Sequence, residues 1–124
     1  MVHLDTHVVV WLAERDFQQL SQPANTAIAQ GPVRITPMVL LELQYLQDMG
    51  RTLLGPDEIV LILAGEIGLT ISDTPFIAVA NQARQVRWTR DPFDRMIVAA
   101  ALADQANLVT KDRLIRTNLP SAVW

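Results

Sequence analysis

The fold of this 124-residue chain is decided by residues 90–102, RDPFDRMIVAAAL, and by the apolar triplet LVT at 108–110. Asp91 is a favourable N-cap residue and Pro92 a favourable first helical residue, so a long helix begins here and is expected to run to about Ala106. The triplet that follows is typical of a short buried strand. A helix that leads directly into a buried strand is characteristic of parallel α/β proteins.

The rest of the chain repeats this alternation of short strands and helices. Strands are expected at residues 2–4, 33–35 and 69–71, with a last extended piece at 122–124. Helices are expected at residues 6–12, 21–30, 37–49, 56–66 and 72–87, with a short one after Asp112. Because parallel strands need long crossover connections, the pattern predicts an α/β fold in which helices cover a short, mostly parallel sheet.

Length and composition narrow the class of protein. A chain of 124 residues predicts a single domain over residues 1–124. The absence of cysteine excludes thiolate catalysis and cysteine-based zinc sites, and it fits a cytoplasmic location. The longest apolar run has eight residues, Met96 to Ala103, far short of the roughly 20 that cross a bilayer. We therefore expect a cytoplasmic protein with no membrane segment and no signal peptide.

The net charge of −3 conceals an uneven distribution of charge along the chain. Residues 1–83 carry a net charge of −6, and residues 84–124 carry +3. A basic third beside an acidic body fits a phosphate-bearing ligand, provided that a divalent cation neutralises the acids. A solvated surface of uneven charge is the alternative.

Two aspartates directly follow predicted strands. Asp5 comes after residues 2–4, and Asp112 follows the strand at 108–110. The carboxyl ends of parallel strands form the edge at which ligands bind, so we expect both side chains at that edge. Helix capping alone would explain either aspartate. The occurrence of both at one edge favours a binding site.

Two further acids fall on apolar helix faces. Glu42 shares a face with Met38 and Leu46, and an unpaired buried carboxylate is costly, so Glu42 is protonated, paired with a cation or bound to a metal. A partly exposed position or a pair with an arginine would also account for it. Asp94 lies four residues before Val98 on the buried face of its helix. Its first-turn position, where the helix dipole favours acids, explains Asp94 without chemistry.

Together the four acids suggest a cation site. Carboxylates that converge on one rim repel each other strongly, and a hard divalent cation relieves that repulsion. Oxygen ligands favour Mg²⁺ or Mn²⁺ over zinc. Such a site suits hydrolysis of phosphodiesters. His3 and His7 lie in the first strand and the following helix, and we expect both to be structural.

Four segments, in order and at these intervals, carry a family resemblance: LDTHVVVW (4–11), ITPMVLLEL (35–43), RDPFDRMIVAAAL (90–102) and LVTKD (108–112). They resemble the PIN-domain ribonucleases, and most closely the VapC-type toxins of prokaryotic toxin–antitoxin pairs. The resemblance covers essentially the whole chain. It implies a PIN-like three-layer α/β/α domain with a short, mostly parallel central sheet.

The resemblance also implies roles for particular residues. The acidic site of the family, catalytic and metal-binding, carries over to Asp5, Glu42, Asp94 and Asp112. Supporting hydroxyl groups carry over to Thr6, Thr36 and Thr110. A further hydroxyl often stands three residues before the glutamate, where this chain has Val39. From their positions beside Asp94 and Asp112, and not from the resemblance, four basic residues are expected to contact the substrate or to pair with the acids when no metal is bound: Arg95, Lys111, Arg113 and Arg116.

The implied activity is that of an endoribonuclease dependent on Mg²⁺ or Mn²⁺, which leaves a 5′-phosphate and a 3′-hydroxyl. The implied partners are an RNA substrate, a cognate antitoxin and a second copy of the chain. A PIN-fold module that binds RNA or protein without cleaving is the alternative. A phosphatase of the haloacid-dehalogenase type is disfavoured, because His7 stands where that class has its second aspartate.

Overall fold

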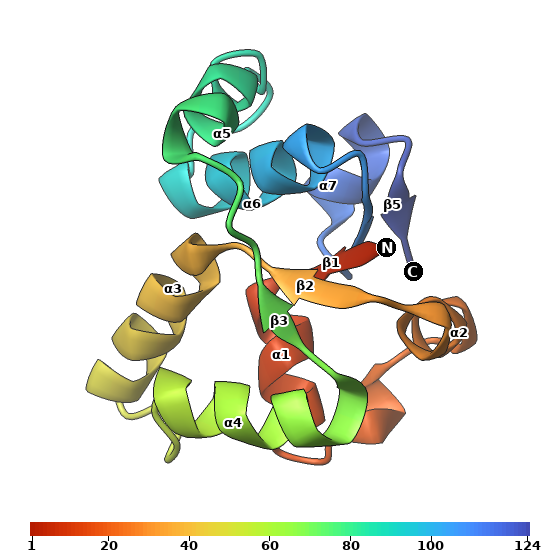
Figure 1. The fold of residues 1–124 in the computed structure, drawn as a ribbon, viewed down its shortest axis with the longest axis vertical. Coiled ribbons are helices and arrows are strands. Elements are labelled where there is room, and N and C mark those ends of the chain that lie inside the picture. The colour runs from red at the N-terminus through yellow and green to blue at the C-terminus, as the bar shows by residue number, and fades with distance from the viewer.

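A computed structural model describes residues 1–124. Its centre is a sheet of five strands, all parallel, in the order β3-β2-β1-β4-β5. The strands are β1 (Val2–Leu4), β2 (Val33–Ile35), β3 (Thr70–Ile71), β4 (Asn107–Val109) and β5 (Ala122–Val123). In register, Val2 of β1 lies between Val33 of β2 and Asn107 of β4. The first strand of the chain is therefore the middle strand of the sheet (Figure 1).

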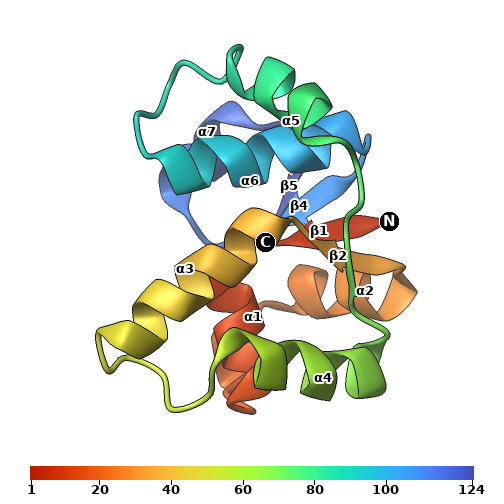
Figure 2. The same ribbon diagram turned by 60° about the vertical axis from the view of Figure 1, so that its left-hand side comes forward.

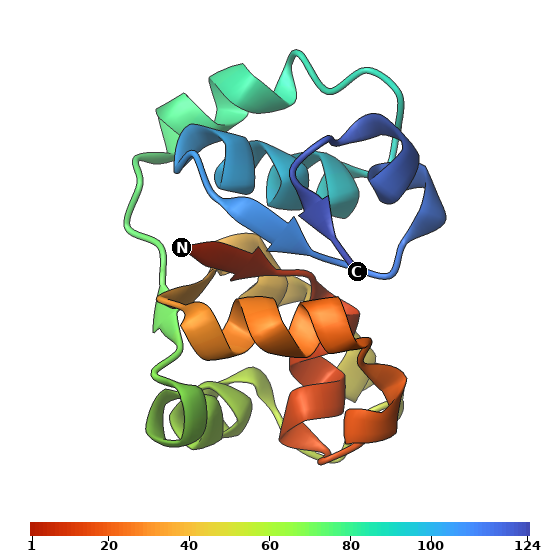
Figure 3. The same cartoon turned by 90° about the vertical axis from the view of Figure 1, so that its right-hand side faces the viewer.

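Helices cover both faces of this sheet. They are α1 (Thr6–Ala13), α2 (Gln22–Gln30), α3 (Pro37–Asp48), α4 (Pro56–Ile67), α5 (Phe76–Ala83), α6 (Pro92–Ala103) and α7 (Arg113–Asn118). On one side lie α5, α6 and α7, and on the other lie α1, α2 and α4 (Figures 1 and 3). Helix α3 extends away from the end of β2 toward α4 (Figure 2). The three-layer α/β/α fold predicted from the sequence is confirmed, with a sheet that is parallel throughout.

The helices begin where the sequence supplies capping side chains. Ser21 accepts a hydrogen bond from the Ala24 amide at the start of α2, and Asp91 accepts from the Phe93 and Asp94 amides at the start of α6. Helix α4 ends at Gly68, whose φ of 68° is left-handed and favours glycine. These caps fix where each helix leaves the sheet, and so they fix the directions of the first-turn side chains.

Two helices are shorter than predicted. The helix expected over 72–87 is confined to α5, because the chain turns at Ala83 and buries Val86 in the core. The helix expected to reach Ala106 ends at Ala103, because Gln105 adopts a φ of 52° and the Ala106 amide donates to the Ala101 carbonyl. A short 3₁₀ helix, Phe17–Gln19, has no counterpart in the predictions.

The apolar core joins the sheet to both helical layers. Leu4, Ile35 and Leu108 are fully buried in three neighbouring strands, and Ile97 and Leu63 bury from α6 and α4. This continuous packing holds the carboxyl ends of β1 and β4 in place. None of the helices is both long enough and apolar enough to span a bilayer.

A buried polar network ties β1 to α6 and to the segment that precedes α5. His3 Nε2 lies 2.7 Å from Asp104 Oδ2, and the Ser72 and Thr74 hydroxyls also donate to this carboxylate. Burial lowers the pKa of His3, so the ring is neutral and donates through Nε2. Burial opposes ionisation of Asp104, but hydrogen bonds from Thr74, His3 and Ser72 outweigh it and lower the pKa of Asp104. His3 is therefore structural, as predicted.

Substitution Asp104→Ala should lower the free energy of unfolding by about 2–4 kcal/mol, because it leaves the buried His3 and Ser72 and the half-buried Thr74 without their shared acceptor. Urea denaturation followed by circular dichroism measures this loss. Asp73→Ala, at an exposed position beside the same network, is the matched control and should change stability by less than about 0.5 kcal/mol. Equal losses in the two variants would contradict the structural role of the network.

Candidate active site

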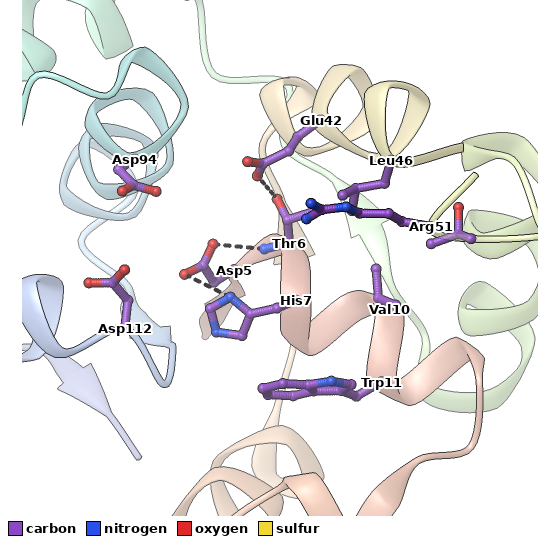
Figure 4. Close-up of a pocket in the computed structure, with 11 residues that line it drawn as sticks. Asp5, Thr6, His7, Val10, Trp11, Glu42, Leu46, Arg51, Asp94 and Asp112 are labelled. Atoms are coloured by element: carbon purple, nitrogen blue, oxygen red, sulfur yellow. Dashed lines mark hydrogen bonds and ion pairs between the residues drawn. The ribbon is translucent and has the colours of Figure 1, made fainter. Parts of the chain in front are cut away.

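Four acidic side chains from four separate segments line one cavity of about 260 Å³. Asp5 and Asp112 follow β1 and β4, at the carboxyl edge of the sheet. Glu42 comes from the middle of α3, and Asp94 from the first turn of α6. Figure 4 shows these carboxylates directed toward a shared space. The structure thus brings together all four acids singled out in the sequence.

Thr110 links the two aspartates at the edge of the sheet. Its hydroxyl donates to Asp5 Oδ2 at 2.6 Å and accepts from the Asp112 amide at 3.1 Å. Asp5 Oδ1 also accepts from the Thr6 amide at 2.8 Å, and Asp112 Oδ1 accepts from the Ile115 amide at 2.9 Å. Each aspartate therefore caps the helix that follows it and still exposes carboxylate lone pairs to the cavity.

Thr6 links Asp5 to the third acid. While the Thr6 amide contacts Asp5, the Thr6 hydroxyl donates to Glu42 Oε1. Burial raises the pKa of Glu42, the hydrogen bond from Thr6 opposes that rise, and the charge of Asp5 adds to it. Glu42 is thus a half-buried acid held in place by a single hydroxyl.

Asp94 is the acid with the least support from the protein. Asp91 takes the capping role at the start of α6, and the Asp94 carboxylate accepts no hydrogen bond. Burial raises its pKa to about 7, with the charges of Asp91, Asp5, Asp112 and Glu42 adding to the shift. A cation that entered the cavity would relieve this repulsion.

The donor set fits a hard divalent cation. The cavity is lined by four carboxylates, with Arg51 the one arginine among them and no lysine, and such all-oxygen sites are preferred by Mg²⁺ and Mn²⁺. No three acidic or histidine side chains meet closely enough in this structure to form a complete cation site. The acids therefore surround the cavity without converging on one point, and ligation would draw them inward.

Thr36, unlike Thr6 and Thr110, forms no hydrogen bond with any of the four acids. Thr36 caps α3 by accepting from the Met38 amide at 3.5 Å, and it is absent from the cavity lining. Val39, where the family often has a hydroxyl, is fully buried in the apolar core. The role of Thr36 in this structure is to set the start of α3, and hence the position of Glu42 relative to the cavity.

The predicted basic residues divide into two groups. Arg95 points away from the cavity, since its guanidinium donates to the Ala83 carbonyl at 2.8 and 3.2 Å. The other three are exposed around the cavity and on α7: Lys111, Arg113 and Arg116. Arg113 and Arg116 line a second hollow together with Trp124. The structure therefore does not bring Arg95 to the acids.

Six residues that line the cavity were not singled out as site residues in the sequence, and three of them are aromatic or cationic: His7, Trp11 and Arg51. His7 Nδ1 lies 3.7 Å from Asp5 Oδ2, and His7 Nε2 accepts from the Lys111 amide at 3.2 Å. Trp11 and Arg51 complete the wall. The spacing of His7, Val10 and Trp11 on one face of α1, directly after Asp5, is the signal that would have found two of them. Arg51 lies after α3, where no periodicity applies.

A separate apolar hollow adjoins the acidic cavity. It shares Val10 and Thr52 with the cavity. The rest of it is lined by Ala13, Glu14, Leu53, Leu54 and Ile59. Leu53 is 97% exposed. An acidic cavity and an apolar groove therefore lie side by side between α1 and the start of α4.

The parallel α/β/α fold and the acidic cavity at its carboxyl edge define the class. Residues 2–117 match the family model of the PIN domain, and the chain belongs to that family. Its sequence is 33% identical over 128 positions to Ribonuclease VapC22 of Mycobacterium tuberculosis (strain ATCC 25618 / H37Rv), with 99% of this chain and 98% of the relative covered.

Solved structures of toxin–antitoxin complexes share the fold. The VapBC2 complex of Rickettsia felis, bound to a promoter DNA fragment, contains a chain with a TM-score of 0.65 at 20% identity, covering 98% of this chain and 96% of that chain. A toxin–antitoxin complex of Klebsiella pneumoniae gives a TM-score of 0.65 at 14% identity, with 100% and 97% covered. DNA-bound VapBC of Salmonella typhimurium gives 0.58 at 19% identity, with 98% and 93% covered.

The raised pKa of Asp94 predicts a pH-dependent effect of Asp94→Asn on stability. The pKa of Asp94 is about 7 in the folded protein, above the reference value of 3.8. Asp94 therefore ionises at lower pH in the unfolded chain than in the folded protein. For this reason the native protein loses stability as pH rises from about 4 to 7. Asp94→Asn removes the ionisable group, so this variant does not lose stability in that pH range. Without divalent cations, it should be more stable than the native protein by roughly 1–3 kcal/mol at pH 8 and nearly equal to it at pH 4.

Urea denaturation in chelator at the two pH values measures this difference. Asp91→Asn preserves the cap, because asparagine caps as well as aspartate, and it tests whether loss of any nearby charge has the same effect. A stability difference for Asp94→Asn that is the same at pH 4 and pH 8 would contradict the raised pKa.

Proposed function

We propose that this protein is an Mg²⁺- or Mn²⁺-dependent endoribonuclease and the toxin component of a toxin–antitoxin pair. The observation that carries the proposal is the acidic cavity, in which carboxylates from four distant segments surround a space. Burial raises the pKa of Asp94 there to about 7, and the charges of neighbouring carboxylates add to the shift. A stable fold alone would not require acidic side chains that repel each other. Similarity to a VapC ribonuclease over 99% of the chain supports the same activity.

Four residues would hold the cation: Asp5, Glu42, Asp94 and Asp112. When bound, a divalent cation lowers the pKa of a water molecule, orients the phosphate and stabilises charge on the leaving oxygen. Thr110 holds Asp5 and Asp112 in their relative orientation, and Thr6 does the same for Asp5 and Glu42. These bonds hold the Asp5 and Glu42 carboxylates and the backbone at Asp112 in place beside the cavity, so less rearrangement is needed on binding.

The proposed reaction adds water across one phosphodiester of RNA. A water oxygen bonds to phosphorus, the P–O3′ bond breaks, and the two protons of that water finish on the 3′-hydroxyl and in solvent, leaving a 5′-phosphate. Lys111 and Arg51 flank the acids and would hold phosphate oxygens by charge-assisted hydrogen bonds. Arg95 takes no part, because its guanidinium is occupied by the Ala83 carbonyl.

A protein antitoxin would neutralise the enzyme by occupying the apolar hollow beside the cavity. The exposed side chain of Leu53 and its neighbours offer an apolar segment a surface that is otherwise left in water. From that hollow, an arginine of the partner would reach the carboxylates. We also propose a homodimer, supported by further exposed apolar side chains on α3 and α5: Leu41, Tyr45, Met49, Phe76 and Ile77.

Cleavage of total cellular RNA by the purified protein, freed of any bound partner, tests the activity. Discrete fragments should form with Mg²⁺ or Mn²⁺ and disappear with chelator. Asp94→Asn, Asp5→Asn and Asp112→Asn should each lower cleavage at least 100-fold, an order of magnitude set by the electrostatic contribution of such groups. They should lose little stability, because each removes one of the repelling charges.

Asp91→Asn is the matched control for Asp94→Asn, since it lies three residues away on the same helix and outside the cavity. It should keep most of the native rate. Cleavage that survives in chelator, or in Asp94→Asn, would contradict the proposed site. Folded protein that binds RNA with the cation present but never cleaves it would favour the non-cleaving binding module instead.

A further inference from the structure

Beside the acidic cavity, three aromatic rings form a row. We call His7, Trp11 and Trp124 the aromatic ledge. The centroids of His7 and Trp11 are 5.0 Å apart, and those of Trp11 and Trp124 are 6.0 Å apart, with interplanar angles of 57° and 52°. Figure 4 shows His7 and Trp11 on the wall of the cavity below Asp5. The ledge joins α1 to the last residue of the chain.

The ledge separates two hollows of opposite charge. Trp11 and His7 line the acidic cavity, whereas Trp124 lines the second hollow with Arg113 and Arg116. These arginines lie three residues apart on α7, a spacing that puts them on one helix face. A chain that leaves the acidic cavity across the ledge therefore arrives at two arginines.

The cations around the ledge are free to bind a ligand. Lys111 Nζ lies 5.7 Å from the centroid of the Trp11 ring, within the range of a cation–π contact. Arg113 and Arg116 are exposed, and neither forms an ion pair with any carboxylate of the protein. Three unpaired cations around two indoles resemble the combination that binds single-stranded nucleic acid, in which bases stack on aromatic rings and cations follow the backbone.

Packing explains only part of this arrangement. Both indoles contact the apolar core, as many partly buried tryptophans do. Core packing does not require them to sit at the openings of two hollows, nor to be surrounded by unpaired lysine and arginine. Trp88 provides the contrast, because it packs against the same core and lines neither hollow.

We propose that the aromatic ledge is a nucleotide-binding subsite for single-stranded RNA, in which an unpaired base next to the scissile phosphate stacks on Trp11 and Trp124. Arg113 and Arg116 bind the next phosphate along the strand. The inference rests on the proposed ribonuclease function, since RNA is taken as the ligand of the acidic cavity. A stacking subsite accepts any base, so it provides affinity and a requirement for unpaired RNA rather than sequence preference.

Binding is measured with the Asp94→Asn protein, so that RNA is not consumed, in Mg²⁺. The probe is a labelled 12-nucleotide single strand of random sequence, compared with the same RNA annealed to its complement. A second Asp94→Asn protein also carries Trp88→Phe, which leaves Trp11 and Trp124 as the only tryptophans. Single-stranded RNA should quench the fluorescence of this protein, and it should bind more tightly than the duplex.

Variants then distinguish binding of RNA by the aromatic ledge from non-specific attraction of RNA to positive charge. Trp11→Leu and Trp124→Ala should each weaken single-strand binding by roughly tenfold and remove the preference over the duplex. Trp11→Phe, which keeps an aromatic ring, should restore much of it. Arg113→Ala with Arg116→Ala should weaken binding and reduce its dependence on salt, whereas Arg87→Ala, at an exposed position outside both hollows, should not.

Cleavage distinguishes this inference from the proposed function. In protein that keeps Asp94, Trp11→Leu should raise KM more than it lowers kcat. The proposed subsite would be overturned, and the ribonuclease function retained, by three results together. The native enzyme would cleave RNA, folded Trp11→Leu and Trp124→Ala would have an unchanged KM, and RNA would not quench the tryptophan fluorescence. Quenching by single strands without any cleavage would overturn the ribonuclease and retain the ledge. Equal weakening of binding by Trp88→Phe and Trp11→Leu would mean that the effect is structural.

Discussion

Mutual repulsion among four carboxylates is the constraint on which the rest of this structure depends. Two unit charges 4 Å apart interact by about 4 kcal/mol at the effective dielectric of a protein surface. The protein does not neutralise this charge internally, because Arg51 is the one arginine in the cavity and no lysine lines it. Threonine hydroxyls bond the carboxylates of Asp5 and Glu42, the Asp112 carboxylate accepts from the Ile115 amide, and Asp94 has its pKa raised to about 7 instead.

The same constraint explains how an acidic protein suits an anionic substrate. Four of the thirteen acidic residues line the cavity at the carboxyl edge of the sheet, whereas Lys111, Arg113 and Arg116 stand outside it, next to aromatic rings. A cation in the cavity would turn the local field from repelling phosphate to attracting it. In the proposed function, the flanking cations and the aromatic ledge would extend the contact along an RNA strand, while the neighbouring apolar hollow would remain available to a protein partner.

Much of this arrangement was predictable from local sequence, and the rest depended on tertiary contacts. Strand triplets followed by Asp5 and Asp112, and the 3.6-residue periodicity around Glu42 and Asp94, are local patterns, and they singled out the four acids that line one cavity in the structure. The ends of α5 and α6 were not predictable from local sequence. Helix α5 ends where the chain turns to bury Val86, and α6 ends before Gln105, which has a positive φ; both features arise only in the packed fold. Arg95 lies near Asp94 in sequence but donates to Ala83, which only the packing of α5 against α6 decides.

The central claim is that these four carboxylates form one cation site, and anomalous diffraction from a crystal soaked in Mn²⁺ tests it most directly. The account predicts a strong anomalous peak between Asp5, Asp94 and Asp112, with Glu42 bound directly or through water, and oxygen distances of about 2.0–2.2 Å, as for similarly sized hard cations. The carboxylates should have moved toward the ion relative to the present structure. A cavity without a peak at saturating Mn²⁺, or a peak held by residues elsewhere, would contradict the claim.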